Sequence, residues 1–266
     1  MVYFYIFYKA QFNRIELFLC PKINKRKKMK QHYEKYTKED LKIWNLLFTR
    51  QEENLQNKAS QTYLNALEQM KPVLNADEIP NFKKINAWFE NETEWQIECV
   101  PGLIPVEEFF ELLSIKRFCA STWLRSMKNL DYLEEPDMFH DVFGHIPLLC
   151  NPIFSDFMEA FGKLGVAIKN DSQKVLQLQR LYWFTIEFGL INEKSNQIYG
   201  AGIASSFGET NLSLGETVEV VPFDLKTILN QPFETDHVQN LYFIIDSFDQ
   251  LFEAITQLET DFTKKK

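Results

Sequence analysis

The pattern that most constrains the fold is the return of an apolar residue every three or four positions, which is typical of helices that bury one face. Leu41, Trp44, Leu47 and Phe48 follow this pattern. Only 9 Gly and 10 Pro occur in 266 residues, which argues against an all-β protein with many turns. The sequence therefore predicts a mainly α protein, with further helices at 63–70, 81–89, 105–113, 153–169, 172–191 and 245–258.

A small β component is expected in two places. Trp95, Ile97 and Cys99 alternate with polar residues just before Pro101, which predicts a short strand. The segment 197–221 is richer in Gly, Ser and β-branched residues, which favours hairpins or short strands. Because no internal repeat or long linker interrupts the chain, we expect a single helix-rich domain with a few short strands.

Residues 1–28 are predicted to be an N-terminal extension, which leaves residues 29–266 as the domain. The opening MVYFYIFYKAQFNRIELFLC is aromatic and apolar, but charged residues interrupt it. It therefore lacks the run of about 18 apolar residues that spans a bilayer. Most of its positive charges follow the apolar stretch, whereas a secretory signal has them before it. A membrane-surface anchor is the alternative for this segment.

Composition bears on the partners and the compartment. The chain has 29 Lys and Arg against 37 Asp and Glu, a net charge of −8. Nucleic acid is therefore a poor candidate partner, because phosphate binding needs clustered basic residues. The four cysteines are scattered without a CxxC pair. Their spacing favours reduced thiols in a cytoplasmic protein over a disulfide framework or a zinc knuckle.

Two of the four histidines lie five residues apart in the stretch EPDMFHDVFGHIPLL. Each residue of an α-helix turns by about 100°, so His140 and His145 would point about 140° apart on one continuous helix. Glycine is the usual residue for a left-handed helix end. We therefore expect a helix that begins near Pro136 to end at Gly144, where the chain reverses and brings the rings together. Pro147 would then prevent the helix from resuming.

A buried acid is the third expected component of a site. The segment RLYWFTIEFGLI is apolar on almost every side of Glu187, which predicts that its carboxylate is buried. A buried carboxylate needs a partner or stays protonated. A lysine or arginine could compensate the charge of this carboxylate. The more specific hypothesis is a metal ion bound by His140, His145 and Glu187. A hydrogen-bonded pair of core histidines is the alternative without a metal.

Two imidazoles and one carboxylate suit two kinds of metal enzyme. This ligand set binds Fe(II) with open positions for oxygen chemistry, and it also binds catalytic zinc with a water molecule. The sequence contains neither HExxH nor HxxEH, the usual zinc patterns. The residues therefore favour iron ahead of zinc.

Four blocks of the sequence resemble the catalytic domain of the pterin-dependent aromatic amino acid hydroxylases, and most closely its short bacterial members. The blocks are VPGLIPVEEFF, STWLRS, EPDMFHDVFGHIPLL, and LYWFTIEFGLI continued by IYGAGIASSFGE. They occur in the order found in the family, between residues 95 and 245. Because four ordered blocks are far more specific than one HxxxxH spacing, the resemblance implies the fold and the chemistry of that family.

The resemblance also implies a role for each residue that matches a family motif. His140, His145 and Glu187 match the iron ligands. The pterin would lie against Leu103, Ile104, Phe109 and Asp141, and the amino acid substrate against Arg125, Pro136, Trp183 and Ser205, with Tyr182 in the active site. Arg125 matches the arginine that pairs with the substrate carboxylate, a role that suits the guanidinium fork.

The implied activity is hydroxylation of L-phenylalanine to L-tyrosine with O2 and a tetrahydropterin at a non-haem Fe(II) site. Tyrosine or tryptophan as the substrate is the alternative within the family, and a zinc-dependent hydrolase with the same ligands is a more distant one. No long regulatory domain precedes these blocks and no long heptad helix follows them, in contrast to animal members, so we expect a monomer. The acidic charge and the interrupted apolar opening imply neither nucleic-acid nor membrane partners. Leu133 stands where animal members often have threonine, which removes one polar substrate contact.

Overall fold

The computed structural model describes residues 29–131, 133, 135–233 and 238–263, so the predicted extension at 1–28 lies outside the described residues. Most of the described residues are helical, which confirms the mainly α class. The longer helices are α2 (Lys38–Leu55), α3 (Gln61–Met70), α4 (Phe82–Phe89), α5 (Val106–Leu113), α6 (Pro152–Ile168), α7 (Ser172–Tyr182) and α11 (Phe248–Thr263). The short helices and helical turns are η1 (Tyr33–Lys35), η2 (Met127–Asn129), η3 (His140–His145), η4 (Pro147–Cys150), η5 (Trp183–Glu187), α8 (Ala201–Ala204), α9 (Phe207–Leu212) and α10 (Leu225–Asn230).

Two small sheets accompany the helices. The first is a parallel pair of β1 (Gln96–Cys99) and β2 (Arg117–Ala120). The second has the strand order β4-β3-β6-β5, formed by β3 (Leu190–Asn192), β4 (Asn196–Ile198), β5 (Glu219–Pro222) and β6 (Leu241–Ile245). Within it, β3 and β4 are antiparallel, whereas β6 is parallel to both β3 and β5. Because β3 begins three residues after Glu187, pairing in this sheet holds the backbone that follows Glu187 in place.

Side-chain caps explain where two of the long helices begin. Thr37 Oγ1 accepts a hydrogen bond from the Asp40 amide at 3.1 Å, and the Asp40 carboxylate accepts one from the Thr37 amide at 2.8 Å. This capping box satisfies two amides at the start of α2. Asn151 caps α6 in a similar way by accepting from the Phe154 amide, and Pro152 occupies the first helical position. These boundaries are therefore encoded locally.

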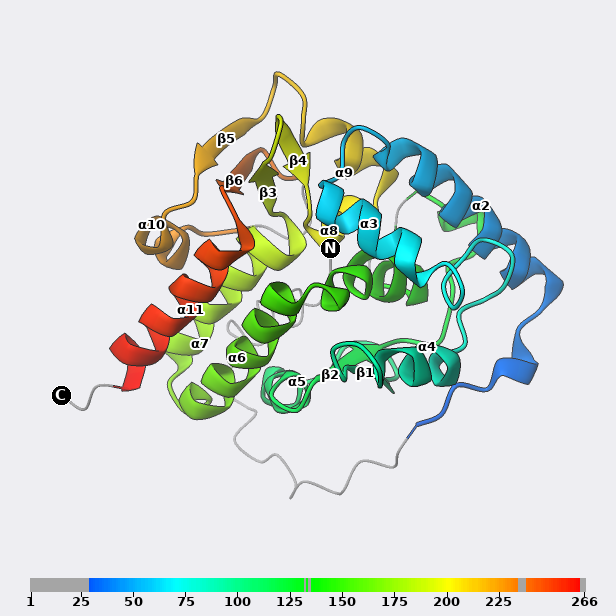
Figure 1. The fold of residues 1–266 in the computed structure, drawn as a ribbon, viewed down its shortest axis with the longest axis horizontal. Helices are drawn as coiled ribbons and strands as arrows, with labels where there is room; N and C mark the ends of the chain where they lie inside the picture. The colour runs from blue at the N-terminus through cyan, green and yellow to red at the C-terminus, as the bar shows by residue number, and fades with distance from the viewer. Residues whose placement is uncertain (1–28, 132, 134, 234–237, 264–266) are drawn as a thin grey trace.

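Helix packing around one continuous core brings the central helices close together. α6 lies between α5 and α11, with α7 beside it (Figure 1). Two glycines of α6 permit its close approach to α5. A Cβ at Gly162 would collide with the backbone of Ser114, and a Cβ at Gly165 would collide with the ring of Phe110. Both positions therefore exclude any larger residue unless α5 moves away.

An aromatic layer from α2 and α3 supports the segment that carries the two histidines. Trp44 lies edge-on to Phe139 with ring centroids 5.6 Å apart, and Phe48 lies edge-on to Phe143 at 5.1 Å. Phe139 and Phe143 stack on each other at 4.8 Å. The Tyr63 hydroxyl donates a hydrogen bond to the Phe143 carbonyl. The apolar face of α2 thus positions η3 from the side away from the imidazoles.

Three predicted elements differ from the structure. The helix expected at 172–191 stops at Glu187, and Leu190–Asn192 forms β3 instead. The helix expected at 245–258 is preceded by β6, and α11 begins only at Phe248. The segment 197–221 contains β4 and β5, but α8 and α9 lie between them. Short apolar runs do not distinguish a buried strand from a buried helix, which explains the first two errors.

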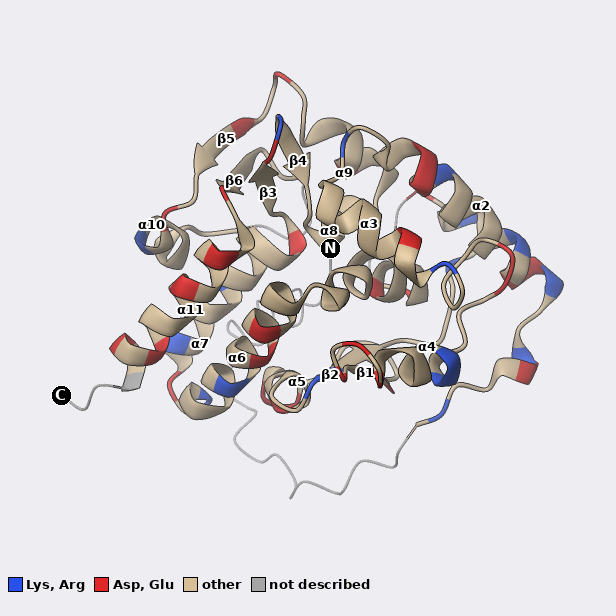
Figure 2. Ribbon diagram, in the orientation of Figure 1, with Lys and Arg blue, Asp and Glu red and all other residues tan. Residues whose placement is uncertain are grey.

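The surface of the described part carries mixed charge. Figure 2 shows Lys and Arg interspersed with Asp and Glu along α2, with other basic residues spread over α4, α7 and α10. In the part of the chain that the structure describes, basic side chains are therefore not gathered on one helix.

None of the described helices combines the length and the apolar character needed to cross a membrane.

Candidate metal centre

His140 and His145 lie side by side in η3, which is a single π-helical turn. Backbone hydrogen bonds in such a turn join residues five apart, so residues with this spacing lie on the same side. His140 Nε2 and His145 Nε2 are 3.2 Å apart, and the ring centroids are 5.0 Å apart. The two rings therefore meet as the sequence predicted.

The backbone conformation predicted to bring the two rings together was wrong. Among the described glycines only Gly102 has a positive φ, so Gly144 is not a left-handed helix end. Gly144 is instead required for close packing, because a Cβ there would lie 2.8 Å from Ala201 O and 3.3 Å from Ser205 Cβ. Pro147 does not stop the helical winding either. It is the first residue of η4, a position where the missing N–H costs nothing.

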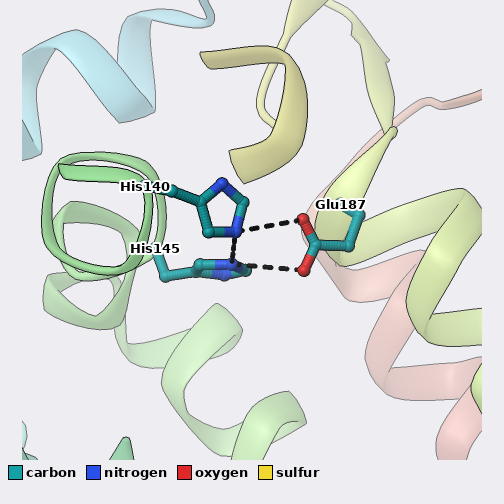
Figure 3. Close-up of side chains that lie close together, drawn as sticks. All are labelled: His140, His145 and Glu187. Atoms are coloured by element: carbon teal, nitrogen blue, oxygen red, sulfur yellow. Dashed lines mark hydrogen bonds and ion pairs between the residues drawn. The ribbon is translucent and has the colours of Figure 1, made fainter. Parts of the chain in front are cut away.

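Glu187 ends the second π-helical turn, η5, which continues α7. The Phe188 amide donates to Trp183 O, five residues earlier, at 2.9 Å. The Glu187 carboxylate is buried, with Oε1 3.2 Å from His145 Nε2 and Oε2 3.7 Å from His140 Nε2. Figure 3 shows these three side chains pointing toward one another from two separate segments. We call them the metal centre. The predicted buried acid thus faces two imidazoles, and no lysine or arginine pairs with it within the described residues.

Ser205 fixes the tautomer of His140. The Ser205 hydroxyl donates to Ala201 O at 2.8 Å, and its Oγ lies 2.9 Å from His140 Nδ1. Because the hydroxyl proton is already used, Oγ accepts a hydrogen bond from Nδ1–H. His140 Nε2 then presents a lone pair to Glu187 and His145. Burial lowers the pKa of His140 well below its usual value, which keeps the ring neutral and able to bind a metal.

Glu187 stays ionised despite its burial. Burial raises the pKa of its carboxyl group, but attraction to His145 and the hydrogen bond from it outweigh this effect and lower the pKa to about 2. Its Oε2 receives no hydrogen bond within the described part of the chain. A buried carboxylate beside an imidazole lone pair is suited to a bound cation, because buried charges are normally paired or bound to metals.

The three ligand atoms fit one metal ion. All of them lie within 4.8 Å of one another. Metal–ligand bonds of about 2.1 Å separate neighbouring ligand atoms by about 3.0 Å at right angles and by about 3.4 Å at the tetrahedral angle. The two Nε2 atoms are 3.2 Å apart, and each of them has a different oxygen of Glu187 nearby, Oε1 at 3.2 Å from His145 and Oε2 at 3.7 Å from His140, which is near these values. Two imidazoles and one carboxylate on one side of an ion leave its other side open, as in non-haem Fe(II) oxygenases.

Tyr182 connects the metal centre to a predicted pterin residue. Its ring centroid lies 6.3 Å from that of His145, and its ring is edge-on to Phe109 at 5.4 Å. Burial and the charge of Glu187 raise the pKa of the Tyr182 hydroxyl well above 10.0, so it stays protonated. Phe109, on α5, is therefore one aromatic layer away from the ligands.

The other predicted pterin residues lie in different surroundings. Leu103 is half-buried and Ile104 is buried, both in the segment just before α5. Asp141 is fully buried under the histidine turn, where its Oδ2 accepts a hydrogen bond from the Ser121 amide at 2.7 Å. This bond ties η3 to the end of β2. A direct contact of Asp141 with a pterin stays a prediction.

A cavity opens beside His140, and its lining includes the predicted substrate residues Arg125, Pro136 and Ser205. Arg125 is oriented before any ligand arrives. Its Nε and Nη2 donate to the two oxygens of Asp137 at 2.9 and 2.8 Å, and its Nη1 donates to Leu130 O at 3.0 Å. A guanidinium has five N–H groups, so two of them have no partner within the described residues. These two groups are available to a carboxylate.

Trp183 lies one layer behind the cavity. Its indole packs at 4.6 Å on Phe188, which lines the cavity, and stacks on Phe233 at 4.8 Å. Its Nε1 donates to Gln239 Oε1 at 3.0 Å. Trp183 therefore shapes the cavity wall through Phe188, and a direct contact with the substrate stays a prediction.

Sequence reasoning assigned no role to six other residues that line the cavity: Asp131, Glu135, Phe188, Gly202, Ser206 and Glu209. Gly202 lies so close to the metal centre that a Cβ there would stand 3.1 Å from Glu187 Oε2. Glu209 is the last residue of the block IYGAGIASSFGE. The sequence feature that could have drawn attention to it is a single acidic residue in a segment rich in Gly and Ser.

Comparison with known proteins identifies relatives of the whole arrangement. Residues 12–265 match the sequence profile of the family described as biopterin-dependent aromatic amino acid hydroxylase. The chain is 46% identical over 226 residues to the phenylalanine-4-hydroxylase of Chromobacterium violaceum, which covers 84% of this chain and 75% of that protein.

Two solved structures of the C. violaceum enzyme share the fold. One contains iron(III) and the oxidised cofactor 7,8-dihydrobiopterin, with a TM-score of 0.82 and 42% identity over 91% of this chain and 94% of that chain. The other contains iron and phenylalanine, with a TM-score of 0.81 and 41% identity over 90% of this chain and 88% of that chain. Because the family match spans nearly the whole chain and the metal centre is in place, this protein belongs to the biopterin-dependent aromatic amino acid hydroxylases.

Proposed function

We propose that this protein is a phenylalanine 4-monooxygenase, which converts L-phenylalanine to L-tyrosine with O2 and a tetrahydropterin at Fe(II). The observation that carries the proposal is the convergence of His140, His145 and Glu187 beside a cavity that contains Arg125. The identity of 46% to the C. violaceum phenylalanine-4-hydroxylase supports phenylalanine as the substrate. The reaction would serve phenylalanine catabolism or the formation of tyrosine.

The metal centre would bind iron by three ligands on one side, while Phe109 would stack on the tetrahydropterin. Iron and pterin together supply the electrons and the site for oxygen activation, and the protein supplies position. Tyr182 holds Phe109 at a fixed distance from the ligands through its edge-on contact. Leu103 and Ile104 would border the pterin ring from the segment before α5.

Arg125 would bind the substrate carboxylate through its two remaining N–H groups. Its pairing with Asp137 keeps the fork oriented, so little conformational freedom is lost when the substrate arrives. Pro136 and Phe188 offer apolar surface to the aromatic ring. The ring would then lie beside the metal centre.

The decisive experiment is turnover by purified protein loaded with Fe(II). Oxygen uptake is measured with tetrahydropterin and phenylalanine, and tyrosine is quantified at the end. We expect tyrosine only when iron, pterin and oxygen are all present. Faster hydroxylation of tyrosine or tryptophan would reassign the substrate within the family. Hydrolytic turnover with zinc, without any need for oxygen, would refute the proposal.

Alanine variants test the ligands separately from turnover. His140→Ala, His145→Ala and Glu187→Ala should each lower the iron content of the purified protein, because a two-ligand site binds the ion weakly. Gly208→Ala is a suitable control, since an added Cβ there meets no atom within 4 Å. Iron content equal to that of the wild type in all three ligand variants would contradict the assignment.

We also propose that the protein acts as a monomer in the cytoplasm. The four cysteines of the sequence are scattered without a CxxC pair, which fits a reducing compartment. Light scattering of the purified protein should give a mass near 31.5 kDa. A mass twice as large at working concentration would contradict the monomer.

A further inference from the structure

Glu209 is a buried carboxylate in the wall of the cavity beside the metal centre. It lies on α9 and is 4% exposed. Its Oε2 is 3.0 Å from the Tyr242 hydroxyl, but the same hydroxyl is 3.1 Å from Gln239 O. A single hydroxyl proton serves one acceptor at a time, so Tyr242 compensates Glu209 only in part.

The second oxygen of Glu209, Oε1, is buried without a hydrogen-bond partner among the described residues. No lysine, arginine or histidine in that part of the chain forms an ion pair with Glu209. Burial raises the pKa of this carboxyl group, although Tyr242 and the backbone of Gln239 act in the opposite direction. A buried acid of this kind needs a cation to be stable in its ionised form.

The other acids around the cavity are not in this condition. Asp131 and Glu135 line it but are exposed, and Asp131 pairs with Arg50 at 2.6 Å. Asp137 uses both oxygens for Arg125. Among the described residues that line this cavity, Glu209 is therefore the buried acid with an oxygen to spare.

The cavity thus offers groups of opposite charge to a ligand. Arg125 has two N–H groups for a carboxylate, and Glu209 has an oxygen for an ammonium group. Leu133, which also lines the cavity, provides no polar atom in its side chain for either. We propose that Glu209 binds the α-ammonium group of the amino acid substrate while Arg125 binds its carboxylate. This inference rests on the proposed function and adds a second recognition residue to it.

Recognition at both ends would make the site specific for free amino acids. A hydrogen bond between two charged groups in a buried site changes affinity by about 10- to 100-fold. Aromatic acids without an amino group would leave Glu209 buried and unpaired. Aromatic amines without a carboxylate would leave Arg125 with its two N–H groups unused. Each should therefore bind less tightly than phenylalanine.

The test measures the binding of three probes by calorimetry to the iron-loaded protein. L-Phenylalanine carries both charges, 3-phenylpropanoate carries only the carboxylate, and 2-phenylethylamine carries only the ammonium group. In Glu209→Gln the amide oxygen can still accept from Tyr242, so the fold should persist while the charge is lost. Glu216→Gln, the same change at an exposed acid, is the matched control.

We expect Glu209→Gln to weaken the binding of phenylalanine and 2-phenylethylamine by about 10- to 100-fold and to change 3-phenylpropanoate binding less than twofold. Equal weakening of all three probes would reduce Glu209 to a structural role, and no weakening would also overturn the inference. If Glu209→Gln did not fold, wild-type binding of 3-phenylpropanoate as tight as that of phenylalanine would still overturn it. A wild-type protein that binds phenylalanine but forms no tyrosine would instead refute the proposed function.

Discussion

Replacing Gly144 with alanine tests whether the histidine turn depends on its contact with α8. The added Cβ would lie 2.8 Å from Ala201 O, 3.2 Å from Ala201 Cβ and 3.3 Å from Ser205 Cβ. Overpacking of this kind costs about 1–3 kcal/mol, and the better helix propensity of alanine offsets about 0.5–1 kcal/mol. The middle of each range gives a net loss of about 1.3 kcal/mol, which should lower the melting temperature by about 3–5 °C.

The assay is thermal unfolding with and without iron, with iron content measured in parallel. Because η3 carries both histidine ligands, displacement of the turn should also weaken iron binding. The iron-loaded variant should therefore lose more stability than the iron-free one. Gly208→Ala should change neither quantity, since its Cβ would meet open space.

An asparagine variant separates packing from backbone conformation. Asparagine adopts the left-handed conformation more readily than alanine, so a left-handed Gly144 would accept asparagine better. Contact with Ala201 predicts the opposite order, because asparagine is larger than alanine. An asparagine variant more stable than the alanine variant would refute the packing argument. So would an alanine variant with the stability and iron content of the wild type.

The remaining predictions concern the surroundings of the metal centre and the core. Ser205→Ala should weaken iron binding by about 10- to 100-fold, because His140 loses the acceptor that fixes its tautomer; an Fe(II) titration measures this, and unchanged affinity would count against that role. The iron-free protein should lose stability as the pH falls below 6.5, by up to about 1.4 kcal/mol per pH unit, because the pKa of His140 is lowered on folding and only the unfolded state takes up that proton. The lowered pKa of Glu187 adds a further loss as the pH falls from 4.5 toward about 2. Urea unfolding between pH 7.5 and 5 measures the first effect, and a flat profile would contradict it. Gly165→Ala should destabilise the protein through Phe110 but leave iron affinity unchanged, and a loss of affinity would show that the core and the site are coupled.

Local patterns were sufficient to predict several elements. The helices at Phe82–Phe89, Val106–Leu113 and Pro152–Ile168 follow apolar periodicity and have recognisable boundaries. The strand Leu241–Ile245 was missed because LYFII is one apolar run with no alternation. Its β conformation depends on pairing with strands far away in sequence, which periodicity cannot reveal.

The two π-helical turns were also beyond local patterns. The spacing of His140 and His145 correctly indicated a shared site, but the widened turn has no clear signature in residue type. It is stabilised by tertiary contacts, such as the Tyr63 hydroxyl on the Phe143 carbonyl. The sequence therefore predicted which side chains meet and not how the backbone brings them together.

Charge pairing was the least predictable part of the site. Arg125 was expected to face a substrate, but its pairing with Asp137 was not foreseen, although the two residues are near neighbours in sequence. Glu209 received no role because its burial depends on α9, a helix in a segment predicted to be strands. Burial and pairing of charges follow from tertiary structure, which residue types alone do not specify.

The metal centre draws its ligands from η3 and η5, two turns that α6 and α7 separate in the chain. A bound ion would therefore act as a reversible cross-link between distant parts of one polypeptide. Saturating a site at a thousand times its dissociation constant stabilises a fold by about 4 kcal/mol. In a cell short of iron, the protein would then be in its less stable iron-free form, which proteases degrade sooner.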